Sequence, residues 1–533
     1  MDRINSTQGA LYARSLSQGP VDRPGSGERE LTVLYYLNGQ ARDLQEQIAE
    51  GFLGIEQIPT GDRVAMVAQL ARKNDYDLSA FKYSIEENAK ENYERAKEAI
   101  FHIPVDGDWA GVRRYEIRHS PHDDAQIPSG KYLDLLDTMP KNPVLHYHIG
   151  KALWSEGSKD DAAYYFQRAE ELGIRQVLQD EGSPKSRAFI RRFRKETRQL
   201  DESWFGKRNF ASTPLETFEE SPSMAEGKTL EDFISWGMRK FPAKHYVLVM
   251  EGHGGGWYGW GDGIEPMAPS EIARAVKSGV REASAASGQP MKMDAIIFNS
   301  CYMANMEAME SLRGSSDVTL ASENFSNGGA VELINGYIAG VGRDIEEGKP
   351  FHAREFARGL VEESRKDQVL KNEKIPGLAD KRAYFHTLSA IDNGKIGDLS
   401  DALARFVDHC KKSGVTYGRV IEKVKQARSY GYDGRNPAYF DLRDLGDLME
   451  KIKDDAHFPE PVRSSAGEVI RGLSGAIIHE HHEVRGMEGS HGLTLWAPLT
   501  LTDEYHRHLV DTYRNNADEF LLRTGWLDFI EGK

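Results

Sequence analysis

The sequence predicts an α/β fold in which helices cover both faces of a mostly parallel sheet. Continuous apolar runs with many β-branched residues recur along the chain, and helix-like stretches lie between them. Strands that are buried on both faces have such unbroken apolar runs, and parallel neighbours need helical crossovers between them. These two observations together predict the fold class.

The expected strands follow one another at recognisable apolar runs. They are 31–37, 63–70, 245–251, 293–299, 318–323, 386–391, 476–480 and 492–498. Helix-like stretches separate neighbouring strands among the first five, apart from the long interval between 63–70 and 245–251. This alternation favours one parallel sheet. The last three runs either extend that sheet or form a second, smaller subdomain.

Between about 75 and 222 the pattern changes to long helices without strand-like runs. Residues 145–173 resemble one tetratricopeptide helix pair, in which small residues let two helices approach closely. The matching small and aromatic positions are Gly150, Gly157, Ala162, Phe166 and Ala169. Ile174 stands where the terminal proline of the repeat belongs, and only one copy is clear. About three repeats are normally needed for independent stability, so we expect a helical insertion docked on the main domain. Structural packing is its simpler role, and binding of a protein partner is the alternative.

The composition limits the partners and the compartment. The chain has 533 residues and a formal net charge of −15, which weighs against nucleic acid as a partner. Its apolar runs are far shorter than the ~20 residues of a membrane-spanning helix. Residues 1–29 are polar and contain no apolar segment of a secretory signal, so they are expected to be a flexible lead. With only two cysteines, the chain fits a reducing compartment, and cytoplasm is expected.

The stretch VLVMEGHGGGWYGWGDG, residues 247–263, carries the first candidate catalytic residue. Its glycines do not form a phosphate-binding loop, because no G-x-x-x-x-G-K-[ST] is present and Trp257 replaces the third glycine of G-x-G-x-x-G. An esterase oxyanion loop would need a G-x-S-x-G nucleophile elbow elsewhere, and the sequence contains none. His253, just past an expected strand, remains as a candidate base.

Cys301 supplies the matching nucleophile at the end of the next expected strand, 48 residues after His253. Reactive groups gather beyond the carboxyl ends of parallel strands, so the two should meet there. An imidazole and a helix starting immediately after the cysteine would both favour the thiolate. The backbone N–H groups of Gly254 and Cys301 would face a developing oxyanion. Cys410 is expected to be an inert residue of an amphipathic helix.

The run IIHEHHE, residues 477–483, has the residue types of a zinc site but not its spacing. In H-E-x-x-H the two histidines are four residues apart on one helical face, whereas His479, His481 and His482 are not. No metal site is expected there.

With these motifs, the chain resembles the clostripain-like cysteine peptidases, which belong to the clan of caspases, legumain and gingipains. The resemblance rests on VLVMEGHGGGW, on IIFNSCYMANMEAME with Glu307 as the trailing glutamate, and on the further segments LTVLYYLNGQARDL, RVAMVAQLAR, TLEDFISWGMRKFPAKHY, TLSAID, YFDLRDL and GLTLWAP. It implies a caspase-like fold and a catalytic dyad of His253 and Cys301 that hydrolyses protein or peptide substrates.

The resemblance also implies a division of the chain. A peptidase core would begin in 30–74, be interrupted by the mainly helical insertion 75–222, continue through a catalytic part in 223–370, and be completed by an α/β part in 371–533. Within the insertion, DWAGVRRYEI (108–117) also has a family-like pattern.

One departure concerns the residue that precedes the cleaved bond, called P1. Family members that cut after Arg or Lys have an aspartate two residues before the cysteine, and this chain has Asn299 there. An amide can accept a hydrogen bond from a guanidinium but provides no charge. Glu323, Asp262 or Glu265 could compensate from nearby loops. A basic P1 residue is favoured weakly, and an uncharged one is the alternative.

Two expectations about regulation come from the family. Some members mature by cutting themselves between histidine and cysteine, where this chain has Arg274, Lys277, Arg281 and Lys292, with 281–292 loop-like. No cofactor is expected from the residues themselves. Calcium dependence is known in the family, and although no D-x-D-x-D-G loop is present, the resemblance leaves calcium open. A protein activator or inhibitor could act through 75–222. The competing hypothesis is a degenerate protease-like scaffold that binds proteins through that insertion.

Overall fold

A computed structural model describes most of the chain. The described residues are 29–41, 44–59, 61–73, 106, 109–119, 129–155, 159–174, 210–218, 221–261, 265–326, 330–374, 387–430, 441–483, 486–501 and 504–533. The expected lead, 1–29, lies outside this set except for its last residue, which begins the first strand.

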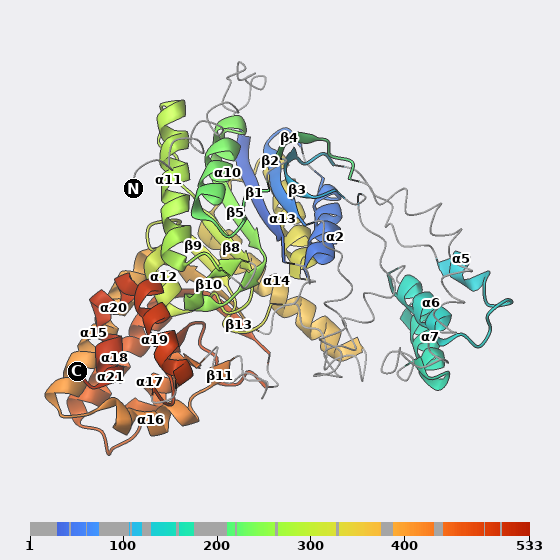
Figure 1. Cartoon of the computed structure of the whole chain (residues 1–533). Helices are drawn as coiled ribbons and strands as arrows, with labels where there is room; N and C mark the ends of the chain where they lie inside the picture. Colours follow the sequence, from blue (N-terminus) through green and yellow to red (C-terminus); the bar gives the residue numbers. More distant parts are fainter. Residues whose placement is uncertain are drawn as a thin grey trace, which may run out of the picture.

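The centre of the molecule is a nine-stranded sheet (Figure 1). Its order is β13-β10-β9-β8-β5-β1-β2-β3-β4. The strands are β1 (Arg29–Gly39), β2 (Val64–Arg72), β3 (Gly111–Glu116), β4 (Pro214–Phe218), β5 (Ala243–Glu251), β8 (Ala295–Asn299), β9 (Val318–Ala321), β10 (Thr387–Asp392) and β13 (Ile477–His482). The five central strands, from β9 to β2, are parallel, and the two at each edge are antiparallel. The predicted mostly parallel sheet is therefore confirmed.

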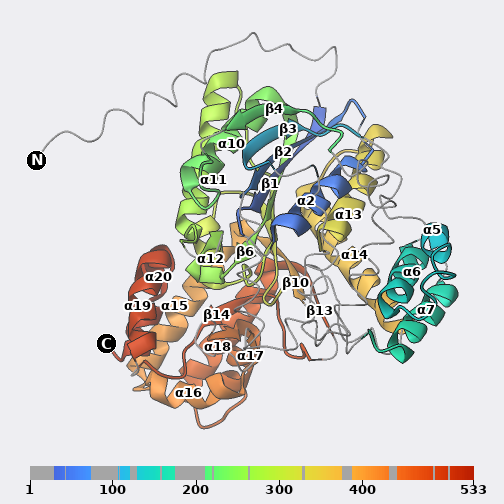
Figure 2. The ribbon, with the colours of Figure 1, turned by 45° about the vertical axis from the view of Figure 1, so that its right-hand side comes forward.

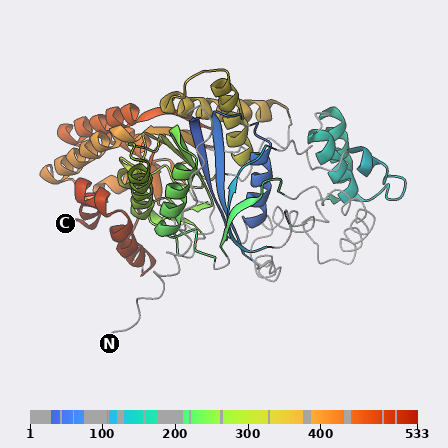
Figure 3. The same ribbon diagram turned by 90° about the horizontal axis from the view of Figure 1, so that it is seen from above.

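Helices cover both faces of this sheet, as predicted (Figure 3). One face carries α10 (Gly227–Lys240), α11 (Pro269–Ser287) and α12 (Met306–Leu312), and the other carries α2 (Gln45–Glu56), α13 (Ala330–Glu346) and α14 (Ala353–Lys374). Side chains alternate between the two faces along each central strand: Leu248 and Met250 pack toward α10 and α11, whereas Val247 and Val249 pack toward α2 and α13. The unbroken apolar runs in the sequence reflect burial on both sides.

The C-terminal part packs beside the sheet and shares its core. Its elements are η2 (Asn393–Lys395), α15 (Ile396–Lys412), α16 (Tyr417–Gln426), β11 (Ser429–Tyr430), β12 (Leu442–Asp444), α17 (Leu445–Lys453), α18 (Glu460–Ala476), β14 (Thr494–Trp496), α19 (Glu504–Asn516), α20 (Asp518–Thr524) and α21 (Trp526–Glu531). Strands β11, β12 and β14 form a separate three-stranded sheet, while β10 and β13 extend the main one. Both alternatives left open by the sequence are thus realised. Cys410 is buried in α15, as expected.

The interval 75–222 contains more than helices. It provides β3 and β4, which form one edge of the main sheet. The expectation of an interval without strands is therefore wrong. The reason is visible in β3, GVRRYE, where the adjacent Arg113 and Arg114 interrupt both an apolar run and a strict alternation of apolar and polar residues. The pattern DWAGVRRYEI overlaps this edge strand.

Three helices of this interval stand apart from the sheet (Figure 2). They are α5 (Ser129–Leu133), α6 (Pro143–Ser155) and α7 (Lys159–Glu171), and they share a small core of their own. A Cβ added to Gly150 of α6 would lie 2.8 Å from the ring of Phe166 in α7, so the two helices are in close contact there. The helix pair is where the sequence predicts it, and its tetratricopeptide-like character stays a prediction.

The segment before β8 differs from the expectation. Residues 281–292 were expected to be loop-like, but α11 continues through Ser287 and ends at Gly288, which adopts the left-handed conformation with φ 68°. Ile272, Val276 and Ala283 keep one face of the helix buried over its whole length. Only 288–294 lies outside regular structure.

A search for membrane-spanning segments finds no described helix that is both long enough and apolar enough to cross a bilayer.

The contact between Gly150 and Phe166 gives a test of the helical unit. Gly150→Leu should force the two helices apart and lower the local stability of the unit by about 2 kcal/mol, a typical cost of overpacking. Amide hydrogen exchange should then accelerate in 143–171 and stay unchanged in β5. Gly130→Leu is the matched control, because a Cβ at Gly130 meets nothing within 4 Å. Equal effects of both substitutions would contradict the packing.

Candidate active site

The two candidate catalytic residues leave the sheet side by side. Strands β5 and β8 are parallel neighbours, and Glu251 is paired with Asn299 at their carboxyl ends. His253 follows β5 by two residues, and Cys301 follows β8 by two residues. A Cβ added to Gly254 would lie 2.2 Å from the carbonyl oxygen of Cys301 and 3.0 Å from its nitrogen. The backbone after His253 therefore touches the backbone of Cys301, as the sequence predicts.

A small hairpin holds His253 in this position. Strands β6 (His253–Gly254) and β7 (Trp260–Gly261) pair antiparallel, with η1 (Gly256–Tyr258) between them. The indole N–H of Trp260 donates to the Ser300 hydroxyl at 2.8 Å, which ties the hairpin to the end of β8. On the other side, Trp257 is buried in edge contacts with Trp496 and Tyr513 of the C-terminal part.

The hairpin leaves the N–H of Gly254 directed away from its partner strand. Trp260, which is paired with Gly254, exchanges both of its backbone hydrogen bonds with Met267, at 2.9 and 2.7 Å. The N–H of Gly255 donates to Gly259 at 2.8 Å. Bonded and non-bonded pairs alternate in an antiparallel ladder, so Gly254 belongs to a non-bonded pair. Its N–H is thus suited to the expected oxyanion role, unlike that of Gly255.

A strained turn follows the cysteine. Tyr302 has φ 62°, a left-handed conformation that is uncommon for a bulky residue, and its N–H donates to Asn324 at 3.0 Å. Asn305 then caps α12 by accepting from the N–H of Ala308. The helix therefore begins at Met306 and not immediately after Cys301. The expected effect of a helix N-terminus adjoining the thiol is wrong, because this turn separates the two.

The thiol of Cys301 is in contact with the backbone of Ser326. Its sulfur accepts from the Ser326 N–H at 3.4 Å and lies 3.8 Å from the Ser326 carbonyl oxygen. Burial raises the pKa of the Cys301 thiol to about 11, and the hydrogen bond from Ser326 opposes this shift only in part. Desolvation therefore opposes the thiolate here, whereas the sequence predicts neighbours that favour it. The physical reason is that desolvation disfavours the charged form.

Asn299 is buried beneath the same segment. The hydroxyl of Ser326 donates to the side-chain oxygen of Asn299 at 2.8 Å, and the exposed fraction of Asn299 is 6%. Ser326 therefore contacts both the nucleophile and the expected P1-binding residue. The sequence did not single out Ser326, because nothing in its local pattern marks it.

The three acids expected to compensate for Asn299 have different surroundings. Asp262 lies outside the described residues. Glu265 is exposed. Glu323 is fully buried, and burial together with the neighbouring Asp444 raises its pKa well above the ordinary value. Its side chain lies with residues of the C-terminal part, and no described contact joins it to Asn299.

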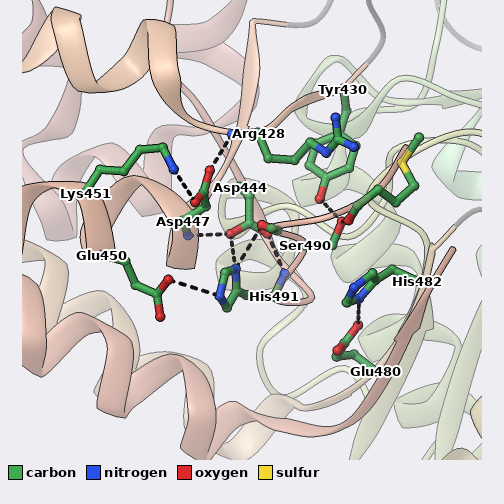
Figure 4. Close-up of polar contacts among 12 residues, drawn as sticks. Arg428, Tyr430, Asp444, Asp447, Glu450, Lys451, Glu480, His482, Ser490 and His491 are labelled. Atoms are coloured by element: carbon green, nitrogen blue, oxygen red, sulfur yellow. Dashed lines mark hydrogen bonds and ion pairs between the residues drawn. The ribbon is translucent and has the colours of Figure 1, made fainter. Parts of the chain in front are cut away.

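A polar cluster lies between the main sheet and the C-terminal part (Figure 4). Glu323 adjoins it, because Asp444 and Glu480 are among the groups that raise its pKa. At the centre of the cluster is Asp444, which accepts from the ring and the backbone N–H of His491 at 2.8 and 2.7 Å. The hydrogen bond with Asp444 raises the pKa of His491 to about 9. The ring of His482 bonds Glu480 at 3.0 Å in the same region. The contacts between Asp444 and His491 join β12 to the loop before β14, whereas the bond between His482 and Glu480 lies within β13.

Glu307 is a second buried acid that links the main sheet to the C-terminal part. It is buried at the start of α12 and accepts from the Trp496 N–H at 2.9 Å and from the Tyr513 hydroxyl at 2.8 Å. Burial raises its pKa to about 7. Glu307 thus connects the turn after Cys301 to the same aromatic residues that hold Trp257.

The histidines of 477–483 do not converge on a metal site. They lie on strand β13, where His479 adjoins Glu362 at 3.6 Å and His482 bonds Glu480. Among the described residues, the group with ligand atoms close enough to share a cation is Glu231, Asp232 and Glu282, on the surface of α10 and α11. The Lys228 ammonium already contacts two of these carboxylates, at 2.9 and 2.8 Å.

Sequence reasoning also missed Glu251. This acid ends the apolar strand β5, two residues before His253, and it is almost completely buried. The sequence did contain a signal, because an acid at the end of a buried apolar strand is costly to bury without a partner. Only the register shows that Glu251 adjoins Asn299.

The burial of Cys301 predicts its reactivity in the resting protein. Because the thiol pKa is raised to about 11, the thiolate fraction should increase about tenfold per pH unit between pH 7 and 9. Alkylation by iodoacetamide, followed by mass spectrometry of the Cys301 peptide, should show this slope. Cys410, whose pKa burial raises to about 12, is the internal control and should stay unlabelled. A rate that levels off by pH 7.5 would instead indicate a preformed thiolate.

The close approach of Gly254 to Cys301 predicts a steric requirement for glycine. Gly254→Ala should separate the two strand ends and destabilise the protein by about 1–3 kcal/mol, because backbone atoms would have to move. Chemical denaturation measures this loss. Gly475→Ala is the control: a Cβ there meets nothing within 4 Å, and alanine favours its helix α18. Unchanged stability of the Gly254 variant would refute the contact.

Comparison with known proteins places this geometry in a family. No curated protein sequence matches the chain. Among solved structures, an inactive zymogen C11 protease from Parabacteroides distasonis is similar at 13% identity and a TM-score of 0.48, covering 94% of this chain and 99% of that one. A secreted C11 cysteine protease from Bacteroides thetaiotaomicron, bound to an irreversible peptide inhibitor, is similar at 11% identity and a TM-score of 0.48, covering 92% and 99%. The sequence model of the clostripain family matches residues 205–532, which include both strand ends of the candidate site. The chain belongs to the clostripain family.

Proposed function

We propose that this protein is a cysteine endopeptidase that cleaves protein or peptide substrates with a dyad of His253 and Cys301. The observation that carries the proposal is the close approach of the Gly254 backbone to that of Cys301 at the adjoining ends of β5 and β8. Membership of the clostripain family supports it. No cofactor is needed for this chemistry, and calcium dependence stays an untested expectation from the family.

The proposed reaction proceeds in two stages. His253 accepts the thiol proton, and the sulfur of Cys301 attacks the carbonyl carbon of the scissile bond. The oxyanion that forms accepts hydrogen bonds from the N–H groups of Gly254 and Cys301. His253 then gives its proton to the departing amine, which leaves a thioester on Cys301. A water molecule, deprotonated by His253, hydrolyses this thioester and restores the free thiol.

A regulated enzyme fits the resting state of the thiol. Because burial raises the pKa of the Cys301 thiol and Ser326 contacts its sulfur, we propose that activation changes the position of this segment. We propose two sources for this change: a partner protein that binds within 75–222, or self-cleavage. Of the basic residues between the dyad members, Lys292 alone lies outside α11, and peptidases need extended backbone at the cut, so Lys292 is the proposed self-cleavage position.

Two further assignments remain proposals. A basic P1 residue is proposed from the family pattern, with Asn299 accepting a hydrogen bond from it. Cytoplasm is proposed from the two free cysteines. The alternative function is a degenerate scaffold that binds proteins through 75–222, and the uncharged Asn299 is the observation that favours it.

A probe and a peptide library distinguish the enzyme from the scaffold. An acyloxymethyl ketone peptide should label Cys301, and Cys301→Ala should abolish both labelling and cleavage of a P1-scanning library. His253→Ala should reduce kcat/KM by about 10³-fold or more, because it removes both proton transfers. Mass spectrometry and fluorogenic assays measure these effects.

Cys410→Ala is the matched control, since that cysteine is buried in α15 and should not affect turnover. Cleavage that persists in Cys301→Ala would show that another group is the nucleophile. A folded wild-type protein that neither reacts with the probe nor cleaves any peptide, even after proteolytic nicking at Lys292, would favour the scaffold.

A further inference from the structure

Glu251 is the most isolated buried acid next to the candidate site. It is the last residue of β5, its exposed fraction is 2%, and neither carboxylate oxygen has a hydrogen-bond partner among the described residues. Burying an unpaired carboxyl group costs several kcal/mol unless the group stays protonated or gains a partner. Burial alone raises its pKa to about 8. The described part of the chain thus offers no internal reason for an acid here.

The sheet register places Glu251 beside Asn299. The two residues are direct partners in the parallel pairing of β5 and β8. Val249 and Ile297, two residues earlier on each strand, both pack on the α2 and α13 face. Because side chains alternate along a strand, Glu251 and Asn299 also project to that face, about 5 Å apart at the backbone.

The surroundings of Glu251 leave its charge unopposed. Its carboxylate lies 3.7 Å from the position that a Cβ on Gly51 of α2 would occupy, and that position also adjoins Val331 of α13. The acid contributes to raising the pKa of Tyr35 on the neighbouring strand β1. No cation is among the causes that shift its own pKa. A substrate cation entering beside Asn299 would be its first opposite charge.

We propose that Glu251 supplies the negative charge that selects a basic P1 side chain, in place of the uncharged Asn299 on the neighbouring strand. This inference rests on the proposed peptidase function and adds to it the residue that determines specificity. Asn299 then orients the P1 group as a neutral hydrogen-bond acceptor, and Glu251 provides the charge-assisted bond. Binding of a lysine or arginine side chain would ionise Glu251 and remove the cost of its burial.

The alternative is that Glu251 is a protonated structural residue. Both explanations predict that the position tolerates glutamine in the folded protein, since Gln has nearly the same shape. They differ in what happens to substrates, because only a residue that contacts P1 can change the ratio between charged and uncharged P1 groups.

The experiment compares four peptides that differ only at P1: lysine, arginine, norleucine and glutamine. It uses the full-length protein and its Glu251→Gln variant. We expect kcat/KM for P1 lysine to fall about 30-fold in the variant, while that for P1 norleucine changes less than about threefold. Adding Asn299→Asp to Glu251→Gln should restore the preference for lysine about tenfold, because the charge returns one strand away. Glu332→Gln, which removes an exposed acid on α13, is the control and should leave the ratio unchanged.

A second variant keeps the test decisive if glutamine impairs folding. Glu251→Asp retains the charge but shortens the side chain by one methylene. It should raise the ratio of arginine to lysine cleavage about threefold, since the longer arginine still reaches the acid. Cleavage with an unchanged P1 ratio in both variants overturns this inference alone. A wild type that prefers uncharged P1 groups overturns it together with the proposed basic specificity. A wild type that cleaves nothing and leaves Cys301 unlabelled overturns the peptidase function itself.

Discussion

The site depends above all on the register of one parallel strand pair. Because Glu251 is paired with Asn299, β5 and β8 end at the same level, and the residues that follow them emerge next to each other. A shift of one residue would reverse the faces of a whole strand. Asn299 would then project toward α10 and α11, and Phe298 would take its place under the site. The buried apolar side chains of both strands exclude that arrangement, so the core fixes the positions of His253, Cys301 and the polar residues beneath them.

The C-terminal part contributes to the same positioning. Trp257 from the histidine hairpin and Glu307 from the helix after the cysteine both contact Trp496 and Tyr513. Two loops from the sheet are thereby held by one aromatic group that comes from the end of the chain. The apolar core is continuous from α10 and α11 to α21. The C-terminal part is therefore integral to the catalytic geometry, which agrees with a family match that extends to residue 532.

The sequence predicts those features that depend on pattern. Every expected strand is present, because burial on both faces leaves an unbroken apolar run. The pairing of His253 with Cys301 follows from two such strand ends. The expectations that proved wrong concern local conformation and burial. The left-handed Tyr302 delays the following helix, and two adjacent arginines hide the strand pattern of β3. The sequence identifies Glu323 as an acid but gives no sign that it is fully buried. Burial likewise raises the pKa of the Cys301 thiol, which the sequence does not show.

A P1-binding carboxylate at position 251, as proposed, would disturb the Cys301 thiol less than a carboxylate at position 299. A carboxylate at 299 would share Ser326 with Cys301, since the Ser326 N–H and hydroxyl contact these two residues. A negative charge that close would raise the thiol pKa further, and burial has already raised it to about 11. Glu251 lies on the neighbouring strand and takes no part in these contacts of Ser326, and Coulomb energy falls with distance. In the proposed arrangement, a cation would therefore be recognised by an acid that does not share a contact with the thiol, which reduces the penalty on thiolate formation.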